Sequence, residues 1–84
     1  MRHFRSKAFK KLYTALPLET RQLADKNFAL LRQNPQHPSL HFKHLRDSIW
    51  SARVGIGHRA LAMRGQDRFQ WFWIDPHDEY ERII

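Results

Sequence analysis

The stretch SARVGIGHRALAM, residues 51–63, decides the fold of this 84-residue chain. Two runs rich in apolar residues flank Gly55-Ile56-Gly57. Because glycine adopts backbone angles that other residues avoid, a tight reversal at this point predicts a β-hairpin. Each arm of the hairpin carries one arginine close to the turn, Arg53 before it and Arg59 after it.

An aromatic strand, residues 69–74, follows the hairpin after a short turn. Side chains of a strand alternate between its two faces, so Phe72 and Ile74 share one face and Trp71 and Trp73 share the other. We expect one of these pairs to be buried against helices, and the other to lie in or near a groove. The alternation alone does not decide which pair is buried.

Further elements lie on both sides of these strands. Residues 40–45 are typical of a strand, and residues 46–48 form the turn into the hairpin. Pro76 can begin a last short helix that continues through Tyr80, because proline fits the first turn of a helix. Consecutive strands usually pair with each other, which predicts a meander.

Two helices precede the strands. Ser6 can cap the first helix, and apolar residues recur at helical spacing from Phe9 to Leu16. Pro17 interrupts this helix and begins the second, which ends at Asn34-Pro35, because a residue before proline leaves the α region. Residues 1–5 either form a short strand or fray.

This order of elements predicts the α+β class, since helices and strands are segregated along the chain. We expect a single domain spanning residues 1–84, with an N-terminal two-helix hairpin packed on an antiparallel meander sheet of about four strands. A short C-terminal helix completes the fold. Leu12, Phe28 and Val54 are expected in its core.

Positive charge dominates the composition, with 15 Lys and Arg against 8 Asp and Glu, a net charge of +7. Such a domain attracts polyanions, either nucleic acid or acidic proteins, although surface charge also serves solubility alone. The chain has no cysteine, no signal-peptide pattern and no apolar run long enough to cross a membrane. We therefore expect a cytoplasmic protein without membrane association.

The chain has six histidines, and histidine is the commonest metal ligand in proteins. His41 and His44 are three residues apart on an expected strand, so their side chains point to opposite faces. The chain also lacks cysteine and the His-Glu-x-x-His pattern. We expect neither a metal nor another cofactor.

Three segments together resemble the RelE/ParE superfamily of toxins from bacterial type II toxin–antitoxin modules. They are HPSLHFK at 37–43, WSARVG with HRAL at 50–61, and WFWIDPHDEYER at 71–82. The resemblance covers nearly the whole chain. It implies a RelE-like fold and a toxin that a cognate acidic antitoxin neutralises. Many members cleave mRNA in the ribosomal A site, so it also implies ribosomes and mRNA as partners.

The resemblance further implies a set of site residues. In the RNA-cleaving branch, basic residues on the central strands hold the scissile phosphate, and a C-terminal basic residue with a nearby aromatic completes the site. Arg53 lies near the strand lysine of that branch, and Arg59 matches its hairpin arginine. His77 falls near the C-terminal basic position. Tyr80 falls near its tyrosine, which can stack on a base. Arg59, His77 and Tyr80 are thus the expected catalytic residues.

RNA cleavage by attack of the 2′-hydroxyl needs no metal. It needs a base, an acid and positive charge on the phosphorane. Arg53 and Arg59 can supply this charge, since a guanidinium binds phosphate bidentately. Lys43 and His58 are the other expected phosphate contacts. His77 and His58 can transfer protons near neutral pH.

Two other functions stay open beside an mRNA endonuclease. One is a non-enzymatic toxin that inhibits DNA gyrase, and the other is a basic interaction module without catalysis. Ser51 stands where the RNA-cleaving branch usually has a second basic residue. Arg59 can alternatively form an ordinary salt bridge with Asp75 or Asp78, and His77 can bond locally at a helix start.

Overall fold

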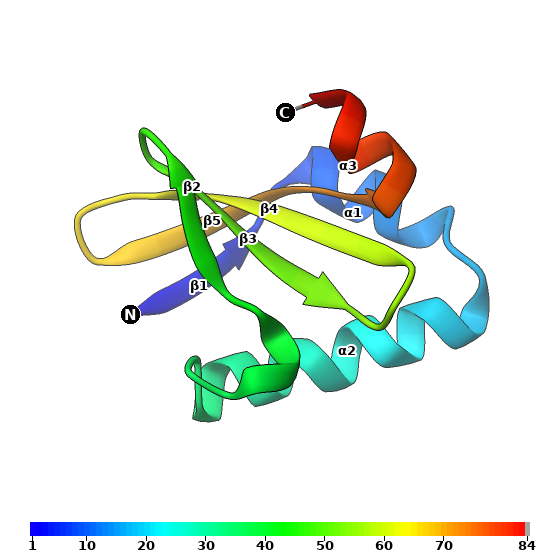
Figure 1. Cartoon of the computed structure of the whole chain (residues 1–84), viewed down its shortest axis with the longest axis horizontal. Coiled ribbons are helices and arrows are strands. Elements are labelled where there is room, and N and C mark those ends of the chain that lie inside the picture. Colours follow the sequence, from blue (N-terminus) through cyan, green and yellow to red (C-terminus); the bar gives the residue numbers. More distant parts are fainter. Residues whose placement is uncertain (84) are drawn as a thin grey trace.

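A computed structural model describes residues 1–83 of the chain; the side chains of Tyr80 and Ile83 are outside the description. The elements follow the order β1 (Arg2–Arg5), α1 (Lys7–Thr14), α2 (Leu18–Gln33), a short 3₁₀ helix η1 (Pro38–Leu40), β2 (Lys43–Arg46), β3 (Ile49–Val54), β4 (His58–Arg64), β5 (Arg68–Pro76) and α3 (His77–Ile83). Figure 1 shows this arrangement, which confirms the α+β class.

Both N-terminal helices begin where the sequence predicts and α2 ends there too, whereas α1 ends at Thr14, two residues before the expected break near Leu16. The hydroxyl of Ser6 accepts a hydrogen bond from the backbone N–H of Phe9 at 3.1 Å, which caps α1. Pro17 precedes the first residue of α2, and Asn34 follows its last. The side chains that α1 and α2 bury come from one stripe of each helix, so the pair packs on the sheet as an amphipathic layer.

The sheet has five strands in the order β1-β5-β4-β3-β2. Strands β2 to β5 form the expected antiparallel meander. The first residues, which the sequence left undecided, form β1 and pair in parallel with β5, so that His3 lies opposite Phe69. The N-terminal strand therefore extends the meander at the edge next to its last strand (Figure 1).

The strand predicted at residues 40–45 is wrong in its first half. Residues 38–40 form η1 instead, and His41 has a left-handed backbone with φ of 43°. Proline favours the first turn of a helix, and the His37 side chain accepts from the Ser39 N–H at its start. Leu40 thereby enters the core, where it is 1% exposed.

The alternation predicted for the aromatic strand is also wrong, because β5 contains a β-bulge. Leu61 of β4 lies opposite Trp73, but the next residue, Ala62, lies opposite Trp71, which leaves Phe72 without a partner. One extra residue in a strand switches the face of the sheet to which each later side chain points. Consequently Trp71 is buried on the same face as Ile74, and Trp73 lies on the other.

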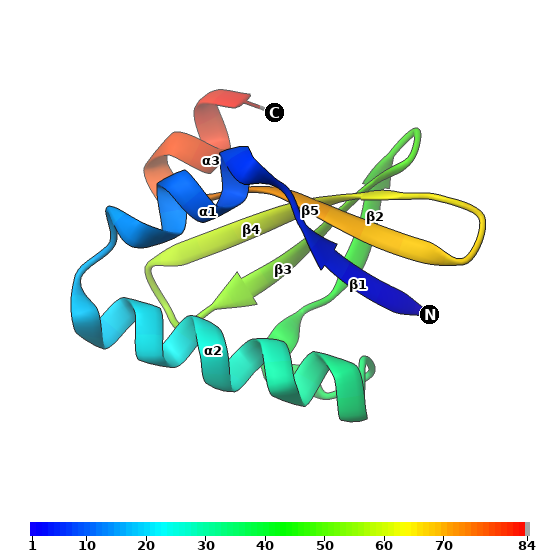
Figure 2. The same ribbon diagram turned by 180° about the vertical axis from the view of Figure 1, so that it is seen from behind.

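Helices α1 and α2 cover one face of the sheet, called here the helix face; it carries Ala52, Ala60, Ala62, Trp71 and Ile74. In Figure 2 both helices lie in front of the strands, whereas α3 lies farther away. Val54 is buried as expected, but Leu12 and Phe28 are only partly buried at the margin of the core. No helix of the described residues is long and apolar enough to cross a membrane.

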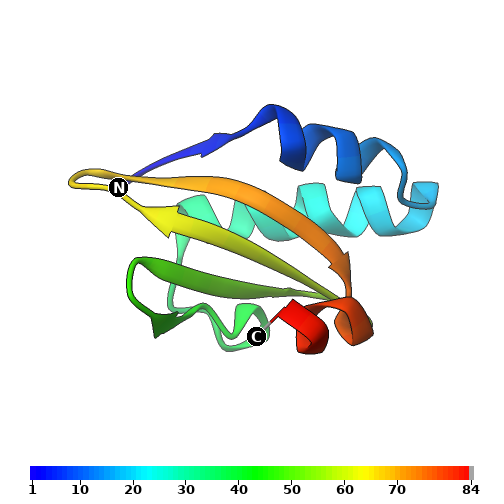
Figure 3. The same cartoon turned by 90° about the horizontal axis from the view of Figure 1, so that it is seen from above.

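Helix α3 packs against β4 and β5 and lies across the strands from α1 and α2 (Figure 3). The second face of the sheet is called here the arginine face. Register and alternation assign to it Lys43, Ser51, Arg53, Arg59, Leu61, Trp73 and Asp75. Leu61 and Ser51 are buried on this face, so it is not an open surface throughout.

Candidate functional site

A row of three charged residues crosses the arginine face near the β3–β4 turn. Arg53 of β3 lies directly opposite Arg59 of β4, which in turn lies opposite Asp75 of β5. Directly opposed residues in an antiparallel sheet have Cα atoms about 4.5–5.5 Å apart. The two arginines and the carboxylate therefore occupy one compact patch.

Lys43 adds a third cation beside this row. It lies opposite Ser51, two residues before Arg53 on β3, so Lys43 is a diagonal neighbour of Arg53 on the same face. Lys43 is exposed, Arg53 is half-buried and Arg59 is 8% exposed. The burial of the three cationic side chains thus increases from the β2 edge of the sheet towards β4.

Asp75 sets the local electrostatics at the buried end of the row. Burial first, and then the negative charge of Glu79, raise the pKa of the Asp75 carboxyl above its ordinary value of 3.8. The positive charge of His58 acts in the opposite direction. The sequence suggests Asp75 only as an alternative salt-bridge partner of Arg59, and the register places it directly opposite that arginine.

His77 is held at the same end of the sheet by the backbone. Its N–H donates to the carbonyl of Gly57 at 2.8 Å, which ties the start of α3 to the β3–β4 turn. Its Nδ1 lies 3.4 Å from Oε1 of Glu81, one helical turn later, an ion pair when the imidazole is protonated. His77 therefore borders the turn from which Arg53 and Arg59 diverge.

The remaining expected residues differ in their placement. His58 lies opposite Val54 and Pro76, so alternation assigns it to the helix face, although it still influences Asp75. The structure does not bring His58 into the row of cations. Tyr80 lies on α3 three residues after His77, and the position of its side chain is outside the described residues.

Ser51 is the residue of this face that sequence reasoning did not assign to the site. It is fully buried, and its Oγ has no hydrogen-bond partner among the described residues. A buried hydroxyl without a partner is costly. The signal in the sequence was its position two residues before Arg53, which puts both on one face of β3. Residues 1–83 contain no group of three or more His, Asp or Glu side chains that could hold a metal ion.

Comparison with known proteins gives no match to a family model and none to a curated protein. Solved structures do match. The RelB–RelE antitoxin–toxin complex of Methanococcus jannaschii gives a TM-score of 0.75 at 13% identity, covering 96% of this chain and 98% of that chain. The YoeB/ParE toxin of Agrobacterium tumefaciens gives 0.70 at 14% identity, covering 92% and 99%.

A third match, the RelBE2 toxin–antitoxin complex of Mycobacterium tuberculosis, gives a TM-score of 0.68 at 20% identity, covering 90% of this chain and 96% of that chain. Each match covers almost the full length of this chain and of the solved chain that it matches. The identities are low, so the likeness is one of backbone architecture. The chain has the RelE-like fold.

Proposed function

We propose that this protein is a RelE/ParE-type toxin that cleaves ribosome-bound mRNA and is neutralised by an acidic antitoxin. The observation that carries the proposal is the row of Arg53 and Arg59 with Lys43 beside it, on one face of a RelE-like fold. Guanidinium groups bind phosphate oxygens bidentately, so two arginines on neighbouring strands of one face can hold a single phosphate between them.

In the proposed reaction the 2′-hydroxyl loses its proton to a base, and its oxygen attacks the adjacent phosphorus. The 5′-oxygen leaves with a proton from an acid, and a 2′,3′-cyclic phosphate remains. Arg53 and Arg59 stabilise the negative charge of the phosphorane, which is worth most where water is excluded, as at the largely buried Arg59. His77 transfers a proton, and Tyr80 stacks on a base.

Lys43 contacts the RNA backbone at the exposed edge of the row. His58 acts on this site through Asp75 rather than by touching the phosphate, because the register assigns it to the other face. When His58 is protonated, it favours the ionised form of Asp75.

The net charge of +7 supports an acidic partner. An acidic antitoxin segment that folds on binding would place carboxylates on the same cations that contact RNA. Binding of antitoxin and RNA would then be mutually exclusive, which accounts for neutralisation without any change in the fold.

A second candidate is a toxin that inhibits DNA gyrase without catalysis. Two carboxylates favour it: Asp75 lies opposite Arg59, and Glu81 pairs with His77. Negative charge beside a phosphate site opposes RNA binding, whereas it suits contact with a protein surface that carries both signs of charge.

Controlled expression in a bacterial host tests the proposal. We expect growth arrest with a fall in protein synthesis, relieved by co-expression of the adjacent acidic open reading frame. Arrest with relaxed plasmid DNA and continuing translation would instead identify gyrase as the target. The variant Arg53→Gln should lose toxicity, while Lys10→Gln, which removes one charge from the exposed surface of α1, should keep it. Full growth with wild-type protein and no antitoxin complex would refute the proposal.

A further inference from the structure

A cavity of about 430 Å³ lies at the other end of the sheet, away from the β3–β4 turn. Its walls come from β1, the segment around η1, and strands β3, β4 and β5, and include His3, His37, Phe42, Trp50, Arg64 and Phe69. Its volume falls within the range of ordinary ligand sites. None of its lining residues is acidic.

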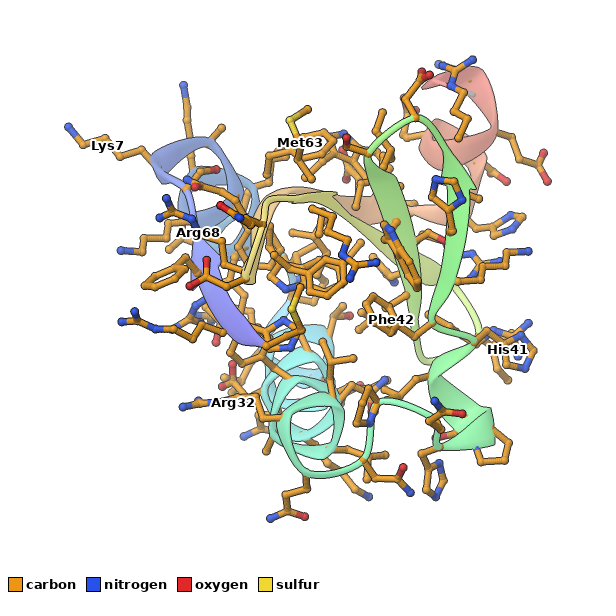
Figure 4. The ribbon with its side chains drawn as sticks, turned by 90° about the vertical axis from the view of Figure 1, so that its left-hand side faces the viewer. Lys7, Arg32, His41, Phe42, Met63 and Arg68 are labelled. Carbon is orange, nitrogen blue, oxygen red and sulfur yellow. The ribbon has the colours of Figure 1, made fainter. Side chains whose placement is uncertain are left out.

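One wall of this cavity is an aromatic cluster. The rings of Phe42 and Trp50 have centroids 5.0 Å apart, and both rings lie edge-on to Phe69 at 5.1 and 5.4 Å. Phe69 is buried, whereas Phe42 and Trp50 are only half-buried and retain exposed surface. Figure 4 looks at this end and shows Phe42 turned towards the interior, while His41 beside it points outwards. Both rings line the cavity and are partly exposed, and aromatic rings that line a binding site can stack on a nucleobase.

Arg64 supplies a cation at the edge of the same wall. Its guanidinium carbon lies 5.8 Å from the centroid of Trp50 and 5.9 Å from that of Phe69. Arg64 is exposed, and the ion pairs found among the described residues lie in α3 and do not include it. A guanidinium stacked on a ring keeps its N–H groups free in the plane, where they can bind a phosphate.

The surroundings of His3 also favour an anion. The Trp71 indole N–H donates to Nδ1 of His3 at 3.0 Å, which places the proton of the neutral imidazole on Nε2. Burial, followed by neighbouring positive charges that include Arg32, lowers the pKa of His3. The N-terminus and Arg32 thus place positive charge close to His3.

This cavity is separate from the candidate phosphate site. Arg59 and Arg64 are five residues apart on β4, a distance of about 16 Å along a strand. They also point to opposite faces, because Arg64 shares the phase of Ala60 and Ala62 on the helix face.

We propose that the cavity binds a nucleotide, with its base stacked on Phe42 and Trp50 and its phosphate bound by Arg64. The nucleotide is either a free mononucleotide or one unit of a single-stranded RNA. This inference goes beyond the proposed toxin function and does not depend on it, since binding here requires neither Arg53 nor cleavage.

NMR titration of ¹⁵N-labelled protein tests this site, with adenosine 5′-monophosphate, adenosine, inorganic phosphate and a five-nucleotide single-stranded RNA as separate probes. We expect the Trp50 indole N–H and the amides of residues 37–42 to shift with the mononucleotide. Adenosine and inorganic phosphate should each bind at least about tenfold more weakly, because each lacks one half of the interaction. Shifts with the RNA but not with the mononucleotide would identify an RNA strand as the source.

Two variants and a control complete the test. Arg64→Gln and Phe42→Leu should each weaken nucleotide binding about tenfold or more, by loss of a charged hydrogen bond or of stacking. Arg46→Gln removes an exposed arginine from β2 that does not line the cavity, and should change nothing. Unchanged affinity in Arg64→Gln with a native circular dichroism spectrum would overturn the proposal. Inorganic phosphate binding as tightly as the nucleotide, or shifts confined to the arginine face, would overturn it as well.

Discussion

Replacement of Arg53 by glutamine tests whether the row of cations contacts RNA. Lys43, Arg53 and Arg59 on the arginine face are the three proposed phosphate contacts. Each contact with single-stranded RNA contributes about 0.7 to the slope of log affinity against log salt concentration. Three contacts give a slope of about −2.1, so a fourfold rise in salt weakens binding about 18-fold. In Arg53→Gln the same rise should weaken it only about sevenfold.

The substitution should not unfold the protein, which makes the result interpretable. Arg53 and Arg59 are directly opposed like charges, an unfavourable arrangement in a sheet, so removing one of them should not lower the stability. The hydrogen bond from Asn27 to Arg53 uses the backbone carbonyl, and the variant retains it. Thermal denaturation should therefore give a midpoint equal to or above that of the wild-type protein.

Fluorescence anisotropy of a labelled single-stranded RNA, measured from low to moderate salt, provides the two slopes. Lys10→Gln on α1 is the matched control, because it removes one exposed charge from the opposite side of the sheet. Its slope should equal that of the wild-type protein. Equal reductions in both variants would mean that RNA is attracted by diffuse charge alone, and an unchanged slope in Arg53→Gln would refute the assigned contact.

Three further predictions concern stability. The pKa of the Asp75 carboxyl is raised in the folded state, so its ionisation opposes folding once the pH rises above the ordinary carboxyl pKa of 3.8. Asp75→Asn should therefore be more stable than the wild-type protein at pH 7, as measured by urea denaturation. This difference in stability should disappear below pH 3.8. Trp71→Ala should lower the free energy of unfolding by about 3–5 kcal/mol, and Trp73→Ala by clearly less; equal losses would contradict the bulge. Ser6→Ala should cost about 1 kcal/mol through the lost cap of α1, whereas Ser6→Asp should restore it in the same thermal melts.

The sequence predicts the hairpin and its arginine pair because local chemistry decides both. The glycines fix the turn, and Arg53 and Arg59 are equidistant from Ile56, so antiparallel pairing must oppose them. The helix boundaries follow for the same reason from a serine cap and two prolines, whose effects extend over a few residues only.

Features set by distant partners are the ones that the sequence does not predict. The bulge at Phe72 depends on how β5 meets β4, and nothing within the aromatic run marks the extra residue. Likewise β1 is a strand because β5 offers it an unpaired edge, not because four residues have a strong preference. The face on which His58 lies is likewise set by the register of β4 with its neighbours, because proximity to the turn does not determine the face.

Primer extension on a cellular transcript, after induction of the protein, tests the central claim most directly. A ribosome-dependent endonuclease predicts new 5′ ends in register with the codons of the translated frame, within minutes of induction. These ends should be absent with Arg53→Gln and present with Lys10→Gln at equal protein levels. Growth arrest by the wild-type protein with intact transcripts would contradict mRNA cleavage.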